Sequence, residues 1–174
     1  CFSGCGATGR LSILLEACWR RFWRHLGSHS HALEQASAAL AERVCSLMTG
    51  GDYALIRSVE NFEDYASFGR RQVAEAGLGA GDVLVGISEG GETSSVIGTI
   101  HEALARGARP FFVFNNPAEI LARHIERSRE VIECPAVTTL DLTSGPMAVA
   151  GSTRMQATTA ELLVVGSALE EALI

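Results

Sequence analysis

Val83-Leu84-Val85-Gly86-Ile87 runs directly into Ser88-Glu89-Gly90-Gly91-Glu92-Thr93-Ser94-Ser95, and a helical pattern follows from residue 92 to residue 106. A short continuous apolar run rich in valine predicts a strand that is buried on both faces. The small, hydroxyl-rich residues after it predict a turn at a helix N-terminus. Backbone N–H groups at such a turn, together with the helix dipole, favour an anion such as a phosphate. We therefore expect phosphate or sugar contacts from Ser88, Gly90, Thr93 and Ser94.

The same arrangement recurs at the start of the chain. Ser3-Gly4-Cys5-Gly6-Ala7-Thr8-Gly9 follows the end of a predicted strand and precedes an amphipathic helix over residues 10–26. We expect Ser3, Gly6 and Thr8 to contact a substrate. The glycines at 4, 6 and 9 also match the dinucleotide pattern GxGxxG. That pattern needs an acidic residue about 20 positions further on, where this chain has Arg20 to His25 inside a predicted helix. A structural turn without a ligand is a third interpretation.

Two further segments carry candidate chemistry. The Gly/Ser/Thr-rich residues 144–155 open the last predicted helix, with Ser152 or Thr153 as its cap and Arg154 in reach of a phosphate or a carboxylate. A capping motif with a surface arginine is the alternative. The acidic segment 60–64 includes Glu63, which either caps a helix or acts as a general base beside a sugar hydroxyl.

Apolar periodicity sets the order of the remaining elements. It predicts strands at 44–48, 111–114 and 130–134, helices at 31–42, 53–59, 62–76, 116–127 and 153–173, and a loop over 138–152. Because strands and helices alternate, we expect a parallel sheet with helices on both faces. Ligands of such sheets bind at the carboxyl ends of the strands, where the three Gly/Ser/Thr segments meet.

Composition excludes several classes of protein. The chain has 174 residues, 47% of them apolar, and a net charge of −6, which disfavours nucleic acid and anionic membranes as partners. All 14 basic residues are arginine, so no lysine is present to form a Schiff base. The five cysteines form no CxxC pair, which favours reduced thiols in the cytoplasm. No apolar stretch reaches membrane-spanning length. We expect one domain over 1–174, truncated at its N-terminus and part of a longer chain.

Metal and cofactor sites are weakly indicated. His29 and His31 form an HxH pair with no third ligand nearby, so we expect no metal site. We also expect no bound cofactor.

Taken together, the motifs resemble the SIS (sugar isomerase) domain family. The nearest branch holds the N-acetylmuramic acid 6-phosphate etherases and the glucokinase regulatory protein. The resemblance is carried by residues 3–11, by 50–54 with 60–64, by 85–97, and by Gly145-Pro146 with 151–155. It implies a flavodoxin-like three-layer α/β/α sandwich with a five-stranded parallel sheet. It also implies sugar-phosphate contacts from Thr8, Ser88, Thr93 and Ser152, an acid at Glu63, and pairing with a second SIS domain, in a homodimer or in tandem.

The chain departs from the etherase pattern in two ways. The resemblance implies a second catalytic glutamate on the first helix, and an ungapped match puts Cys18 there. Glu16 lies off the apolar stripe, where an ion pair with Arg20 explains it. Glu89, Glu92 and Gln156 also make the phosphate loop and last motif less cationic. We therefore expect a regulatory or sensing domain that binds a hexose phosphate or amino-sugar phosphate. The alternative is a phosphosugar lyase or isomerase with Glu63 as general base.

Overall fold

The structure is a computed structural model that describes residues 1–29, 33–57, 61–152 and 154–173. Within these residues one sheet has five parallel strands in the order β2-β1-β3-β4-β5. The strands are β1 (Phe2–Gly4), β2 (Ser46–Met48), β3 (Val83–Ile87), β4 (Arg109–Phe114) and β5 (Thr138–Asp141). This is the flavodoxin-like order, so the expected α/β fold is confirmed.

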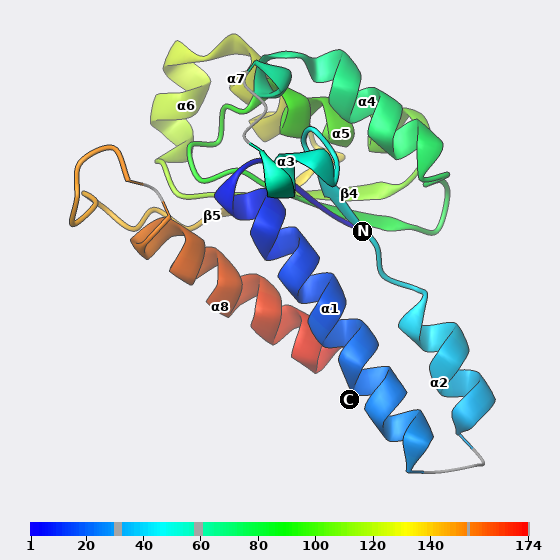
Figure 1. The fold of residues 1–174 in the computed structure, drawn as a ribbon. Coiled ribbons are helices and arrows are strands. Elements are labelled where there is room, and N and C mark those ends of the chain that lie inside the picture. Colours follow the sequence, from blue (N-terminus) through cyan, green and yellow to red (C-terminus); the bar gives the residue numbers. More distant parts are fainter. Residues whose placement is uncertain (30–32, 58–60, 153, 174) are drawn as a thin grey trace.

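Helices cover both faces of the sheet (Figure 1). They are α1 (Ala7–Ser28), α2 (Glu34–Ala41), α3 (Tyr53–Ile56), α4 (Ala66–Glu75), α5 (Ser94–Ala105), α6 (Ala118–His124), α7 (Glu126–Ile132) and α8 (Gln156–Glu171), with a 3-10 turn η1 (Phe62–Asp64). Helices α1 and α8 lie side by side on one face, and α4 to α7 lie on the other. None of the described helices has the length and apolar content that a membrane span requires.

The two faces of the sheet have separate apolar cores, because neighbouring residues on a strand point to opposite sides. On β4, Phe112 and Phe114 pack under α5, whereas Val113 packs toward α1 and α8. On β3, Leu84 belongs to the first core and Ile87 to the second. Both central strands are therefore buried on two sides, as the apolar run at 83–87 predicts.

Two predicted elements are wrong. The strand expected at 130–134 is absent, because residues 130–132 belong to α7, in which Ser128 and Val131 are both buried and share one face of the helix. Tertiary packing of that face outweighs the β-propensity of Val131 and Ile132. The fifth strand is instead Thr138–Asp141, inside the predicted loop. It is an edge strand with no fully buried residue, so it lacks the apolar run that marks a central strand.

Two predicted helices are interrupted. The helix expected at 62–76 is split by Tyr65, whose backbone is extended at φ −105° and ψ 104°. The helix expected at 116–127 is split at Ile125, which has a similar conformation at φ −129° and ψ 104°. The interruption at Tyr65 separates η1, which carries Glu63, from α4.

Helices α4 and α5 approach through glycine. A Cβ added to Gly69 of α4 meets the Ser95 carbonyl oxygen at 1.8 Å, and one added to Gly98 of α5 meets the Ala66 carbonyl oxygen at 2.1 Å. Both distances are far below van der Waals contact, so only glycine allows this spacing. The contact holds α4, and η1 before it, against the N-terminal half of α5.

We expect Gly98→Ala to lower the free energy of unfolding by about 1–3 kcal/mol, because the added methyl must push the two helices apart. Gly166→Ala in α8 is the matched control, since an added Cβ there meets nothing closer than Leu162 Cδ1 at 3.9 Å. Higher helix propensity makes the control neutral or stabilising by up to about 1 kcal/mol. Urea denaturation measures both changes. Equal stabilities for the two variants would contradict the close approach.

Candidate functional site

The candidate site lies where the strand order reverses. Strands β1 and β3 are neighbours with Gly4 opposite Ile87, yet their following helices pack on opposite faces of the sheet. The loops that follow them diverge and leave a crevice at the carboxyl ends of the strands, the usual ligand position in this fold. A cavity of about 420 Å³ lies there. It is lined by Cys5, Gly6, Ala7, Glu63, Asp64, Glu89, Glu92, Thr93, Ser94, Arg127 and Arg154.

The loop after β1 forms one wall of the cavity. Gly6 has φ +57°, a left-handed conformation that favours glycine, and it lines the cavity. Thr8 is buried, where its Oγ1 donates to the Cys5 carbonyl oxygen at 2.9 Å and accepts from the Cys5 N–H at 3.0 Å. Ser3 is also buried, and its Oγ accepts a hydrogen bond from Thr99. The structure therefore places Gly6 at the cavity surface and Ser3 and Thr8 beneath it.

The loop after β3 forms the second wall, and its carbonyl groups are all engaged. The six consecutive carbonyl oxygens from Ser88 to Thr93 each accept a hydrogen bond from the protein. The donors are the backbone N–H groups of Gly91, Asn115 and Ile97 and the side chains of Asn116, Ser128 and Arg127. This arrangement fixes the peptide dipoles of the loop without help from a ligand.

Some hydroxyl groups of this loop line the cavity, and another is buried and stabilises the loop. Thr93 and Ser94 line the cavity at the start of α5, where the first N–H groups of a helix have no intrahelical acceptor. Ser88 is buried, and its Oγ lies 2.9 Å from Thr93 Oγ1. Gly90 is not among the lining residues, and its carbonyl oxygen accepts a hydrogen bond from Asn116.

Glu63 lies in the third wall, with Asp64 beside it. Both belong to η1, which begins after Asn61 at φ +69° and packs against α5. Glu63 is half-buried, and its charge acts on the Cys5 thiol across the cavity. The structure thus brings Glu63 to the same cavity as Thr93 and Ser94. Glu60 lies outside the described residues.

The segment before α8 closes the cavity from the other face of the sheet. Arg154 lines the cavity, whereas Ser152 is not among the lining residues and Thr153 lies outside the described residues. Gln156 braces the loop before the helix, since its side chain bonds the Ala148 N–H and the Pro146 carbonyl. Two residues along the helix, Thr158 Oγ1 donates to Glu89 Oε1 at 3.3 Å.

The cavity has an acidic balance. Its lining holds the four carboxyl groups of Glu63, Asp64, Glu89 and Glu92 but only two guanidinium groups. Arg127 lies 4.0 Å from the Glu92 carboxylate and also donates to its carbonyl oxygen. Burial raises the pKa of Glu89, although Thr158 and Arg154 favour its charged form. Burial also raises the pKa of the Cys5 thiol, so Cys5 is a poor nucleophile at neutral pH.

Glu161 lies behind this wall and was not predicted from the sequence. It is 0% exposed, and neither carboxyl oxygen has a hydrogen-bond partner among the described residues. It shares the buried face of α8 with Ala157 and Val165. Burial and the charge of Glu89 raise its pKa to about 9. The only sequence signal is a glutamate at a position of the helix where the pattern calls for an apolar residue.

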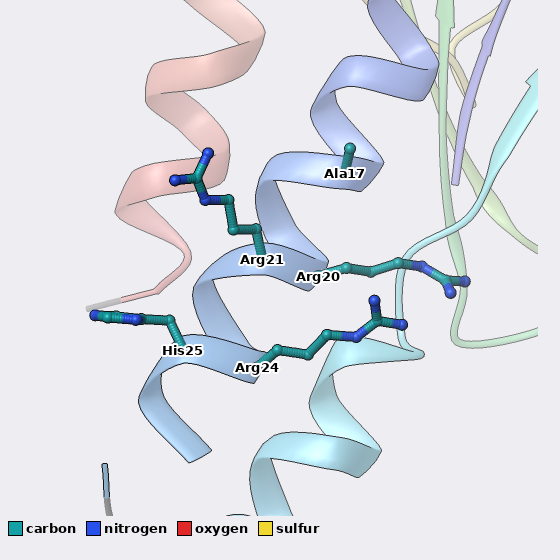
Figure 2. Close-up of a pocket in the computed structure, with 5 residues that line it drawn as sticks. All are labelled: Ala17, Arg20, Arg21, Arg24 and His25. Carbon is teal, nitrogen blue, oxygen red and sulfur yellow. The ribbon is translucent and has the colours of Figure 1, made fainter. Parts of the chain in front are cut away.

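A larger hollow, of about 530 Å³, lies elsewhere on α1 and is not a candidate site. Figure 2 shows Arg20 and Arg24 pointing to the side of α1 where α2 lies, whereas Arg21 and His25 point away from it. Arg20 also pairs with Glu16 at 2.9 Å and with Glu42 at 3.0 Å. The cationic groups therefore do not converge on one ligand.

The expected pairing of Glu16 with Arg20 is confirmed, and Glu16 also accepts a hydrogen bond from Ser46. Cys18 is exposed and lies in a groove between α1 and α8, outside the cavity. Of the HxH pair, His31 lies outside the described residues and His29 bonds the His25 carbonyl. Among the described residues, no group of three or more metal-binding side chains comes together.

A parallel α/β sandwich with two small-residue loops at the switch point of the strand order defines a flavodoxin-like ligand-binding domain. The family model of the glucokinase regulatory protein N-terminal SIS domain matches residues 1–104. The chain therefore belongs to the SIS-domain family, as the motifs indicate.

Curated relatives are N-acetylmuramic acid 6-phosphate etherases. The Bacillus licheniformis etherase 1 is 29% identical over 174 residues, covering 99% of this chain and 49% of the relative. The Picosynechococcus etherase is 33% identical over 159 residues, covering 91% and 44%. The chain thus spans about half the length of the curated relatives it matches.

A solved structure supports the fold. Phosphoheptose isomerase GmhA from Neisseria gonorrhoeae aligns with a TM-score of 0.56 and 16% identity, covering 97% of this chain and 74% of that chain. At this identity the likeness concerns the fold alone.

The buried carboxyl group of Glu161 makes stability depend on pH. The folded protein keeps a proton that the unfolded chain releases between about pH 4.5 and pH 9, because the pKa is near 9 only when the chain is folded. Stability should therefore fall as pH rises through this window, by up to about 1.4 kcal/mol per pH unit. Glu161→Gln removes this contribution. Thermal unfolding of both proteins from pH 5 to pH 9 checks it. The same change of melting temperature with pH in wild type and in Glu161→Gln would contradict it.

Proposed function

We propose that this domain binds a sugar phosphate and serves as a sensing or regulatory domain. The observation that carries the proposal is the cavity at the β1–β3 switch point, on which the start of α5 and the loop before α1 converge. Helix N-termini favour anions through their unpaired N–H groups and their dipoles. The acidic and hydroxyl side chains around them suit the hydroxyl groups of a sugar.

The phosphate is assigned to the α5 side of the cavity. Thr93 and Ser94 offer hydroxyl groups there, at the start of α5, where the first N–H groups of the helix have no intrahelical acceptor. Arg154 supplies a positive charge from the opposite side of the cavity. The sugar ring then extends toward Glu63.

The residue at the position of the second etherase glutamate favours a domain that binds the sugar phosphate without converting it. An ungapped match of the motifs puts Cys18 at that position, and Cys18 lies outside the cavity, in the groove between α1 and α8. Glu16, the nearest glutamate on α1, is held by Arg20 and Ser46. Of the two acids that the etherase pattern implies, only Glu63 lies in this cavity.

Thr93→Val tests the phosphate position, because valine keeps the shape of threonine and removes the hydroxyl group. We expect wild-type protein to bind at least one of fructose 6-phosphate, glucosamine 6-phosphate and N-acetylmuramic acid 6-phosphate in titration calorimetry. Loss of a hydrogen bond to a charged group should weaken binding about tenfold. Thr138→Val on the edge strand β5 is the control and should bind like wild type. Absence of binding by all three sugar phosphates would refute the proposal.

The second candidate function is a phosphosugar lyase with Glu63 as general base. It is favoured by the position of Glu63 in the cavity beside Thr93 and Ser94, and by the etherase relatives. On this reading, full-length protein releases lactate from N-acetylmuramic acid 6-phosphate, and Glu63→Gln reduces the rate by about 100-fold or more. The lactate assay decides between the two candidates. Binding without lactate release supports the regulatory domain.

A second SIS domain is the partner we propose, either in a homodimer or in tandem. The groove between α1 and α8, of about 380 Å³, is lined largely by apolar side chains, among them Leu15, Phe22, Leu163 and Leu169. Leu163 is 64% exposed in the isolated domain. Sedimentation velocity of wild type against Leu163→Glu tests this surface, and identical association of the two would rule it out. The five cysteines carry free thiols, which supports a cytoplasmic setting.

A further inference from the structure

Arg127 is a cationic group of the cavity to which the proposed function gives no role. It belongs to α7 and lines the cavity, and its Nε donates to the Glu92 carbonyl oxygen at 2.6 Å. The next residue, Ser128, is buried and donates to the Gly91 carbonyl oxygen at 2.7 Å. Two consecutive residues of α7 thus hold the loop after β3, and the first of these bonds fixes where the guanidinium group lies.

The terminal nitrogens of this guanidinium group remain free to bind a ligand. Among the described residues, none accepts a hydrogen bond from Nη1 or Nη2 of Arg127. Nη2 lies 4.0 Å from Glu92 Oε2, which is beyond hydrogen-bond distance. The Arg127 side chain is 49% exposed, so a ligand in the cavity can reach it. An arginine that is anchored through Nε and has free terminal N–H groups suits the oxygens of a phosphate.

The Glu92 carboxylate lies at the place where an anion would meet this arginine. It lines the same cavity and is the acidic group that faces the Arg127 terminal nitrogens. Its side chain also folds back over the loop, because a Cβ added to Gly90 would meet Glu92 Oε1 at 3.6 Å. The carboxylate and the guanidinium group are both about half exposed and share no hydrogen bond, so their attraction is weak. A stronger anion can therefore displace the carboxylate.

We propose that Arg127 binds the phosphate of the sugar phosphate through its terminal nitrogens, and that the Glu92 carboxylate holds this position until the ligand displaces it. The inference rests on the proposed function, which assigns the phosphate to the α5 side of the cavity. The planar guanidinium group can donate two parallel hydrogen bonds to phosphate oxygens. A phosphate group carries more negative charge at pH 7 than a carboxylate does, so it competes well for the arginine.

Glu92 then acts as a specificity-determining residue. Its negative charge opposes every anion that enters this side of the cavity, and only a ligand that binds Arg127 more strongly than the carboxylate does gains from the exchange. Removing the carboxylate should strengthen binding of the phosphate, whereas removing the guanidinium group should weaken it. The two substitutions are therefore expected to change affinity in opposite directions.

The experiment measures, by titration calorimetry, the Kd of fructose 6-phosphate, glucosamine 6-phosphate and N-acetylmuramic acid 6-phosphate. We expect Arg127→Met to weaken binding of the ligand that wild type binds by about tenfold, because hydrogen bonds to a charged group are lost. Glu92→Gln should strengthen binding about threefold, because it removes a half-exposed repulsive charge and keeps the size of the side chain. Both differences should shrink between about 50 mM and about 500 mM sodium chloride, since salt screens charges.

The matched controls come from a second ion pair on the same helix. Arg129 and Glu126 lie 3.2 Å apart, are exposed and do not line the cavity. Arg129→Met and Glu126→Gln remove the same charged groups as the two test substitutions and should bind like wild type. Circular dichroism shows that each variant is folded.

The outcomes separate this inference from the function beneath it. An Arg127→Met protein that binds like the controls overturns the assignment of Arg127, and a Glu92→Gln protein that binds no more tightly than wild type overturns the role of the carboxylate. A loss in Arg127→Met that is equal at both salt concentrations indicates a loosened loop and also overturns the inference. In these cases wild type still binds, so the sugar-phosphate site stands. Absence of binding by both wild type and Glu92→Gln overturns the inference together with the proposed function.

Discussion

The parallel pairing of β1 with β3 is the constraint on which the rest of the molecule depends. It places two loops from distant parts of the chain side by side, while the right-handed connections carry α1 and α5 to opposite faces of the sheet. The crevice between these loops follows from topology and needs no special residue. The chemistry of the crevice is then set by what reaches it from η1 and from the segment before α8.

The central part of the fold could be predicted from the sequence, and the edges could not. Strand β3 could be predicted because burial on both faces leaves an uninterrupted apolar run, and helix α5 could be predicted from its apolar stripe at helical spacing. Strand β5 has one apolar residue, Leu140, because an edge strand has one neighbour and little burial. The sequence predicts a strand where α7 lies, because Val131 and Ile132 favour strands locally. Both residues pack into the core on the face of the sheet that α5 covers, and this packing makes the segment helical.

The candidate site shows the same division between local and long-range information. The loops predicted from the motifs meet at one cavity, which is lined by Gly6, Glu63, Thr93, Ser94 and Arg154. Ser3, Thr8 and Ser88 come from the same motifs but are buried, where their hydroxyl groups hold the loops together. Sequence cannot distinguish these two uses of a hydroxyl group, because both require a small polar residue at a tight turn. Glu161 was not predicted, because its raised pKa depends on burial and on the charge of Glu89, which is 72 residues away along the chain.

The hydrogen-bonded loop after β3 has a consequence for the energetics of recognition. A loop whose carbonyl groups all accept hydrogen bonds from the protein is ordered before a ligand binds, so the loop loses little conformational entropy on binding. Ordering a flexible side chain or loop residue otherwise costs about 0.5–1.5 kcal/mol each. Differences in affinity between ligands then reflect mainly the water that each polar group must give up. Selectivity at such a rigid site therefore depends on the different desolvation free energies of the ligands rather than on different conformations of the loop.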